Sequence, residues 1–161
     1  MREEFQVRIA KAEHVFSAAH FITFNGICER LHGHNYRVAV EVDGPLDVNQ
    51  YVVDFIAFRD RVRTITTELD HYVLLPTQHP QIAVTADEES VTASFEGRTW
   101  VFPRGDCRLL PVSNTTSELL ARYIGERLLS DLRELDFRPS RLRVEVDECD
   151  GQLGIWTCRP K

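Results

Sequence analysis

Apolar and polar residues alternate along four stretches of the chain. The alternation covers residues 5–15 and 36–42, ends at Gly44-Pro45, and returns over residues 142–148 and 153–158. Successive side chains of a β-strand point to opposite faces, so each stretch predicts a strand with one buried face. These four strands are the expected framework of a sheet.

Two other stretches repeat apolar residues every third or fourth position, which is the spacing of one helix face. The first covers residues 55–69, with Phe55 as the first residue of its apolar stripe, and follows Asp54, a side chain suited to the N-cap of a helix. The second covers residues 117–134 and follows the sequence Thr-Thr-Ser-Glu at 115–118, which has the form of a capping box. Pro139 closes this second helical segment.

The stretch from about 76 to 112 interrupts the pattern. Residues 82–84, 91–95 and 99–102 are β-prone, and Glu96-Gly97-Arg98 has the composition of a turn, which predicts an extra hairpin. The order of predicted strands and helices along the chain predicts a single α+β domain over residues 1–161, with a four-stranded antiparallel sheet backed by two helices on one face. Such a short sheet has open edges, which favour pairing with another chain.

Composition narrows the classes of partner. The 19 basic and 25 acidic residues give a net charge of −6, which argues against a general nucleic-acid-binding protein but leaves an anionic small molecule open. Residues 1–6 lack the apolar run of a signal peptide, and no stretch approaches the ~20 apolar residues of a membrane span. A cytoplasmic protein is therefore expected, with its four cysteines as free thiols.

The densest polar group is the sequence from Cys28 to His34. His32 and His34 lie two residues apart, so on a strand both imidazoles face one side and can bind one ion. His14 and His20 share a parity but lie about 20 Å apart at roughly 3.3 Å per residue, so only one can join the pair; an antiparallel connection places His20 there. Three imidazoles on Zn²⁺ leave a coordination position open, as in catalytic sites. The alternative is that His32 and His34 are exposed polar positions of a half-buried strand.

Three further features carry candidate chemistry. Cys28 is open to three interpretations: a fourth metal ligand, a buried structural thiol, or a nucleophile or base, whose pKa a nearby Zn²⁺ or imidazole would lower. Asp70-His71 places a carboxylate beside an imidazole after the first helix, although such pairs are commonly capping or surface residues. Glu148 ends a predicted strand, where it is either solvated or accepts two N–H groups of a planar heterocycle.

The chain resembles the 6-pyruvoyltetrahydropterin synthase and 6-carboxytetrahydropterin synthase family. The matching motifs follow family order over nearly the whole chain: Phe16-Ser17-Ala18-Ala19-His20, Cys28-x-x-x-His32-Gly33-His34-Asn35-Tyr36, Val53-Asp54-Phe55, Leu69-Asp70-His71, Thr116-x-Glu118 and Val144-x-Val146-x-Glu148. The resemblance implies the tunnelling fold, in which three subunits join their sheets into a barrel and two trimers form a homohexamer.

The resemblance also implies roles for particular residues. Zn²⁺ would be held by His20, His32 and His34, and a pterin triphosphate would contact Glu148, Glu29 and Thr116. Cys28 would be the base, with Asp70 and His71 of an adjacent subunit completing the proton transfer. Arg30, Arg37 and Arg104 are candidates for the triphosphate by neighbourhood alone.

The implied reaction converts 7,8-dihydroneopterin triphosphate to 6-carboxy-5,6,7,8-tetrahydropterin on the deazapurine (queuosine) pathway. Two alternatives remain within the enzyme class, the 6-pyruvoyl product and cleavage to 6-hydroxymethyl-7,8-dihydropterin for folate synthesis. Glu29, directly after Cys28, departs from the pattern and keeps the second of these open. The insert and Cys149, where the family commonly has threonine, leave room for a non-catalytic pterin-binding paralogue. A purely structural zinc domain is a further alternative, which predicts unfolding on chelation.

Overall fold

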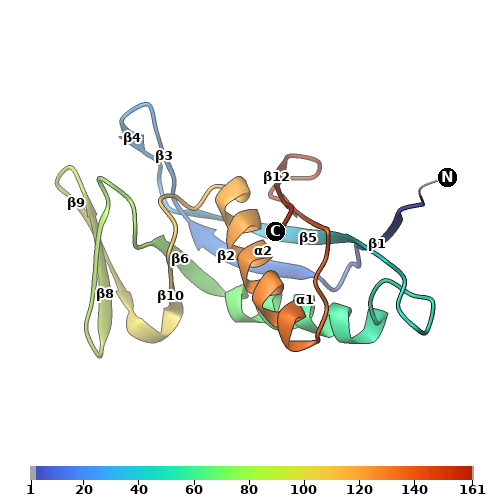
Figure 1. Ribbon diagram of the computed structural model, residues 1–161. Coiled ribbons are helices and arrows are strands. Elements are labelled where there is room, and N and C mark those ends of the chain that lie inside the picture. Colours follow the sequence, from blue (N-terminus) through green and yellow to red (C-terminus); the bar gives the residue numbers. More distant parts are fainter. Residues whose placement is uncertain (1–2, 161) are drawn as a thin grey trace.

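A seven-stranded sheet covered on one face by two helices forms the centre of the computed structural model, which describes residues 3–160 (Figure 1). The sheet has the order β10-β6-β2-β5-β11-β12, and β1 pairs with β5. Its strands are β1 (Phe5–Ile9), β2 (Val15–His20), β5 (His32–Gly44), β6 (Tyr72–Pro76), β10 (Cys107–Leu110), β11 (Arg141–Asp147) and β12 (Leu153–Cys158). The strands predicted near the C-terminus are confirmed.

The predicted four-stranded antiparallel sheet is wrong in strand number and in direction. β6 lies parallel to both β2 and β10, which makes the sheet mixed. The reason β6 gives no alternating pattern is that both of its faces are covered: Leu74 packs in the core under the helices, whereas Leu75 packs in a second core beneath the insert. A strand buried on both faces is apolar at successive positions.

The predicted first strand is interrupted. β1 and β2 both pair with β5, but Ile9 stands opposite Val40 and Val15 opposite Arg37, so residues 10–14 face only residues 38–39. This local excess of chain on one side is a bulge. The buried positions change parity across the break, from Val7 and Ile9 in β1 to Phe16 and His20 in β2, so Val15 does not join the buried face it was expected to share. His14 lies inside the break and is fully buried.

Both helices pack on the same face of the sheet (Figure 1). Helix α1 (Phe55–Leu69) begins after Asp54, whose carboxylate accepts hydrogen bonds from the amides of Ile56 and Ala57, both at 2.8 Å, so the predicted N-cap is confirmed. The apolar stripe of α1 is buried from Phe58 onward, whereas Phe55 is exposed, contrary to its expected place in that stripe.

Helix α2 (Ser117–Glu134) has the predicted bounds but not the predicted cap. Thr116 is the N-cap residue, and its side chain makes no capping hydrogen bond. Thr115 is buried instead, and its hydroxyl donates to the carbonyl of Phe21 over 3.2 Å. The residue that resembled a capping side chain therefore ties the start of α2 to the end of β2.

The segment between β6 and β10 forms a separate three-stranded sheet at one end of the molecule (Figure 1). Its strands are β7 (Ala83–Ala86), β8 (Ser90–Phe95) and β9 (Arg98–Pro103), and a 3₁₀ turn, η1 (Arg104–Asp106), leads into β10. The predicted hairpin is confirmed as β8–β9, with its turn at Glu96-Gly97, where both residues have positive φ.

A small hairpin, β3 (Thr23–Phe24) and β4 (Ile27–Cys28), leaves the sheet between β2 and β5 at the same end as the insert (Figure 1). Neither α1 nor α2, the α-helices described between residues 3 and 160, combines the length and the hydrophobicity of a membrane-spanning segment.

Candidate metal centre

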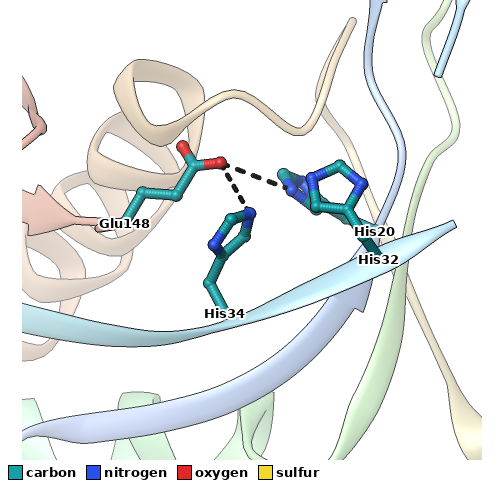
Figure 2. A group of neighbouring side chains, drawn as sticks. All are labelled: His20, His32, His34 and Glu148. Atoms are coloured by element: carbon teal, nitrogen blue, oxygen red, sulfur yellow. Dashed lines mark ion pairs between the residues drawn. The ribbon is translucent and has the colours of Figure 1, made fainter. Parts of the chain in front are cut away.

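Three imidazoles meet where β2 ends and β5 begins (Figure 2). In the antiparallel register His20 stands opposite His32 and Ala18 opposite His34. The ring centroid of His20 lies 4.7 Å from that of His32 and 5.3 Å from that of His34. The centroids of His32 and His34 are 4.9 Å apart. The structure thus brings together the three histidines chosen from spacing, and it leaves His14 out.

Gly33 explains how the two strands approach closely at this point. A Cβ atom built on Gly33 would lie only 2.9 Å from the backbone oxygen of Ala18 on β2. A side chain here would push β5 away from β2 and separate His20 from His32. The glycine between the two histidines is therefore required by the packing of the strands.

Two backbone carbonyls fix the orientation of the rings. Nδ1 of His20 lies 2.9 Å from the carbonyl oxygen of Thr115, and Nδ1 of His32 lies 2.9 Å from that of Arg30. A carbonyl can only accept, so both rings carry their proton on Nδ1 and offer the lone pair of Nε2 to the site. The Tyr36 hydroxyl, 3.1 Å away, donates to Nε2 of His20.

Burial favours the neutral forms that bind a cation. Burial lowers the pKa of His20, and the carbonyl of Thr115 and the charge of Glu148 only partly oppose this. Burial likewise raises the pKa of the Tyr36 hydroxyl far above its ordinary value. At neutral pH the site therefore presents a neutral imidazole beside an un-ionised phenol.

Glu148 completes the group (Figure 2). Its Oε1 lies 3.0 Å from Nε2 of His34 and 3.6 Å from Nε2 of His20, and Ser117 at the start of α2 donates to its Oε2 over 3.0 Å. Sequence reasoning placed Glu148 with the substrate and overlooked both its contact with the histidines and the role of Ser117. The Val-x-Val-x-Glu alternation put Glu148 just past a strand, but nothing local indicated which strand would be its neighbour.

The donor set fits a divalent metal ion. One ligand atom from each of the four side chains lies within 4.8 Å of the others. Nε2 of His34 is buried and has no partner in hydrogen-bond geometry among the described residues, because the nearby Glu148 oxygen is close in distance but poorly aligned. A cation between these atoms would satisfy that lone pair, and neutral imidazoles with a carboxylate are ligands that suit zinc.

Cys28 lies outside this group of ligand atoms. It is buried at the end of β4 and packs in the second core with Phe21 and Leu75. Burial raises the pKa of its thiol, which the charge of Arg98 opposes without reversing. Without a metal ion nearby, apolar packing therefore outweighs the positive charge of Arg98.

Glu29 faces the histidines where Cys28 does not. Its Oε2 lies 3.9 Å from Nε2 of His32, and both side chains are partly exposed. Together with Cys28 and Arg30 they line a pocket of about 640 Å³. The pocket gives a small molecule access to this side of the histidine group.

Asp70 and His71 form a defined pair that is not among the grouped ligand atoms, although His71 lines a surface pocket together with His34. Asp70 accepts a hydrogen bond from the amide of Ser17 over 2.7 Å, and His71 Nδ1 lies 2.8 Å from the other Asp70 oxygen. Burial tends to raise the pKa of Asp70, yet these hydrogen bonds bring it below its ordinary value. The His71 side chain is 81% exposed and its φ is +63°, an uncommon backbone state for a non-glycine residue.

The remaining candidates are spread over the surface. Thr116 serves as the backbone N-cap of α2, Arg37 pairs with Asp150, and Arg104 lies in the 3₁₀ turn. Only Arg30 shares a pocket with one of the histidines.

The fold and the site together define an α+β protein with a tri-histidine and glutamate group built across two antiparallel strands. Comparison with known proteins identifies its family. Residues 8–155 match the model of 6-pyruvoyl tetrahydropterin synthase, and the chain belongs to that family.

Relatives and solved structures agree with this assignment. The chain is 31% identical over 139 residues to a putative 6-carboxy-5,6,7,8-tetrahydropterin synthase of Methanocaldococcus jannaschii, covering 85% of each chain. It is 31% identical over 134 residues to a protein of the same description from Pyrococcus abyssi, covering 82% of this chain and 80% of the relative. The 6-pyruvoyl tetrahydropterin synthase structure of Plasmodium vivax superposes with a TM-score of 0.91 at 26% identity, covering 99% of this chain and 100% of the other.

Proposed function

We propose that the protein is a zinc enzyme that converts 7,8-dihydroneopterin triphosphate to 6-carboxy-5,6,7,8-tetrahydropterin in the cytoplasm. The proposal rests on the convergence of the Nε2 atoms of His20, His32 and His34. Backbone carbonyls fix the protonation of His20 and His32 from behind, and Nε2 of His34 lacks a hydrogen-bond partner among the described residues. The relatives described as 6-carboxytetrahydropterin synthases favour this product over the 6-pyruvoyl compound.

The metal would be held by His20, His32 and His34. When bound, zinc supplies a Lewis acid that acidifies protons next to the hydroxyls of the substrate side chain. Glu148 is the candidate anchor for the pterin ring, because a carboxylate can accept two N–H groups of a planar heterocycle. Ser117 orients that carboxylate through Oε2.

Proton transfer would involve groups from two subunits. Cys28 is the candidate base within the chain, and it needs the field of a bound cation to offset the burial that raises its pKa. His71 is held through Nδ1 by Asp70 and is largely exposed, so its free Nε2 can reach a site on a neighbouring copy. A trimer joined through sheet edges, stacked into a hexamer, would provide such a neighbour and cover the open edges of β10 and β12.

A second reaction has an observation in its favour. Glu29, not Cys28, places an ionisable group 3.9 Å from a ring nitrogen of the metal site. A carboxylate base at this position would favour cleavage of the side chain to 6-hydroxymethyl-7,8-dihydropterin. The product then depends on which of two adjacent residues removes the proton.

Anaerobic incubation of the zinc-loaded protein with 7,8-dihydroneopterin triphosphate, followed by mass analysis of the products, tests these alternatives. The carboxylated product, lost in Cys28→Ala with zinc retained and preserved in Glu29→Gln, supports the main proposal. The hydroxymethyl product, lost in Glu29→Gln, supports the second. Binding of the pterin without any product contradicts both and identifies a non-catalytic binding paralogue.

A further inference from the structure

The insert sheet contacts the segment that carries both candidate bases. At the start of β9, Arg98 donates from Nη1 to the carbonyl oxygen of Cys28 over 2.7 Å and from Nη2 to that of Glu29 over 3.3 Å. A guanidinium presents its donors in a rigid fork, so two successive carbonyls are held in a fixed relation to one another. Sequence reasoning placed Arg98 in a turn and gave it no role.

The guanidinium of Arg98 is itself held in place. Its Cζ lies 4.5 Å from the ring centroid of Trp100, and Trp100 stacks on Phe21 with centroids 4.6 Å apart. Phe21 is fully buried and directly follows His20. Among residues 3–160, Arg98 has no carboxylate within ion-pairing distance, so its position is set by the two carbonyls and the aromatic stack.

The β3–β4 hairpin is short and is held by the insert together with Asn114, which precedes α2 and donates to the carbonyl of Thr23 over 3.1 Å. Each of its strands has two residues, and Phe24 and Ile27 at its tip are exposed. Thr23, which pairs with Cys28, is held from the insert side by His79, whose Nε2 lies 2.6 Å from the Thr23 hydroxyl. Contacts from the insert side thus hold both strands of the hairpin, and Arg98 holds the end that leads to His32.

We infer that Arg98 is a positioning residue: by holding the carbonyls of Cys28 and Glu29 it sets how these two side chains stand relative to the histidine group. The chemical consequence rests on the proposed function, because it concerns which of the two groups reaches the substrate. The insert then takes part in the choice of product, although none of its strands contributes a ligand to the described metal group.

The primary test compares Arg98→Gln with wild type by hydrogen–deuterium exchange and by turnover, with Arg122→Gln, an exposed α2 arginine, as control. We expect faster amide exchange confined to residues 22–31, unchanged zinc stoichiometry, and kcat lowered about 10- to 100-fold, the range for a misplaced catalytic group. Arg98 also lines the pocket beside His32, so KM should change as well, but by less than kcat. The ratio of carboxylated to hydroxymethyl product should change as well, whereas Arg122→Gln should match wild type throughout.

Two further variants separate positioning from general destabilisation. Arg98→Lys retains the charge but cannot hold both carbonyls in a fork, so it should show the same localised exchange even where Arg98→Gln does not fold. In Arg98→Ala, added methylguanidinium should restore protection of residues 22–31 and part of kcat.

Unchanged exchange of residues 22–31 in Arg98→Lys, or altered exchange with kcat and products as in wild type, overturns the inference. A wild-type protein without turnover contradicts the proposed function alone, because the exchange experiment still reports whether Arg98 holds this segment.

Discussion

At the residue scale, neighbours distant in sequence decide what each histidine can do. His20 and His14 are both buried histidines of the first 20 residues, yet only His20 has a carbonyl behind it and imidazoles in front of it. His14 has no hydrogen-bond partner on either ring nitrogen within the described part of the chain. The same side chain is a candidate ligand in one place and a packing residue in the other.

Loss of one imidazole should therefore abolish the metal site. We expect His34→Ala to lower zinc affinity by more than the roughly 10- to 100-fold typical of an outer-shell change, because it removes an inner ligand. Isothermal titration of the metal-free protein with zinc measures the effect. His14→Phe is the matched control, and equal zinc affinities in the two variants would contradict the assignment.

His14 should make the fold sensitive to acid. Burial lowers the pKa of His14 below 6.5, and Lys11, Arg59 and Arg63 add to this while Glu13 opposes it. Below pH 6.5 the unfolded chain binds a proton that the folded chain resists, so stability is full above that pH and falls as the pH drops toward the folded pKa. We expect the loss of unfolding free energy between pH 8 and pH 5, measured with urea, to be smaller in His14→Phe than in wild type.

Two other histidines, the buried His20 and the partly buried His79, limit the size of this difference in unfolding free energy. His20 and His79 also have pKa values lowered by burial, so some acid sensitivity should persist in the variant. An identical loss in His14→Phe and wild type would show that His14 does not resist protonation.

At the scale of elements, close contacts decide where glycine is needed. In α2, a Cβ atom on Gly125 would lie 2.2 Å from Cζ3 of Trp156 on β12. Helix propensity alone favours alanine over glycine by about 1 kcal/mol, whereas overpacking a core costs roughly 1–3 kcal/mol. The helix–sheet contact should therefore prevail over the local preference.

Urea unfolding of Gly125→Ala tests this balance. We expect a lower unfolding free energy than wild type, because Trp156 must move to admit the methyl group. Ser130→Ala, at an exposed position of the same helix, should be neutral or slightly stabilising. A stabilised Gly125→Ala would show that Trp156 gives way without cost.

At the scale of the whole molecule, the metal group lies beside the main core, and Tyr36 of that core contacts His20. The cluster between the helices and the sheet, with Phe16, Tyr36 and Leu120, consists of apolar side chains whose packing does not require a metal ion. We expect removal of zinc with a chelator to abolish turnover while the far-UV circular dichroism spectrum stays unchanged and the melting temperature falls modestly. Global unfolding on chelation would instead favour a structural zinc domain.

A shared site should show complementation between subunits. Neither the His71→Ala variant nor the His34→Ala variant should convert the substrate alone. Mixed oligomers reassembled from both variants should regain part of the activity. Each mixed interface can pair an intact histidine group from one subunit with an intact Asp70-His71 pair from another. No recovery in oligomers shown to be mixed would place all catalytic groups within one chain.

The sequence predicts those residues of the site that lie on one pair of adjacent strands, β2 and β5. His32 and His34 follow from a two-residue spacing, and His20 from the reach of an antiparallel neighbour. Glu148 and Ser117 were not assigned to the group because they come from the end of β11 and the start of α2, and only packing brings these together. The role of Arg98 was not predicted because its partners are backbone carbonyls. Every residue has a carbonyl, so the residue types at 28 and 29 do not reveal the contact.

The sequence by itself determined the helices, the strands β5, β11 and β12, the β8–β9 hairpin and the histidine group, because periodicity and short spacings are local properties of the chain. Only the tertiary structure decided that β6 and β10 join the sheet in parallel, that Cys28 lies in an apolar core while Glu29 faces His32, and that the insert holds them both. These outcomes depend on which surfaces meet, and burial and hydrogen bonding between distant segments are fixed only once the chain has folded.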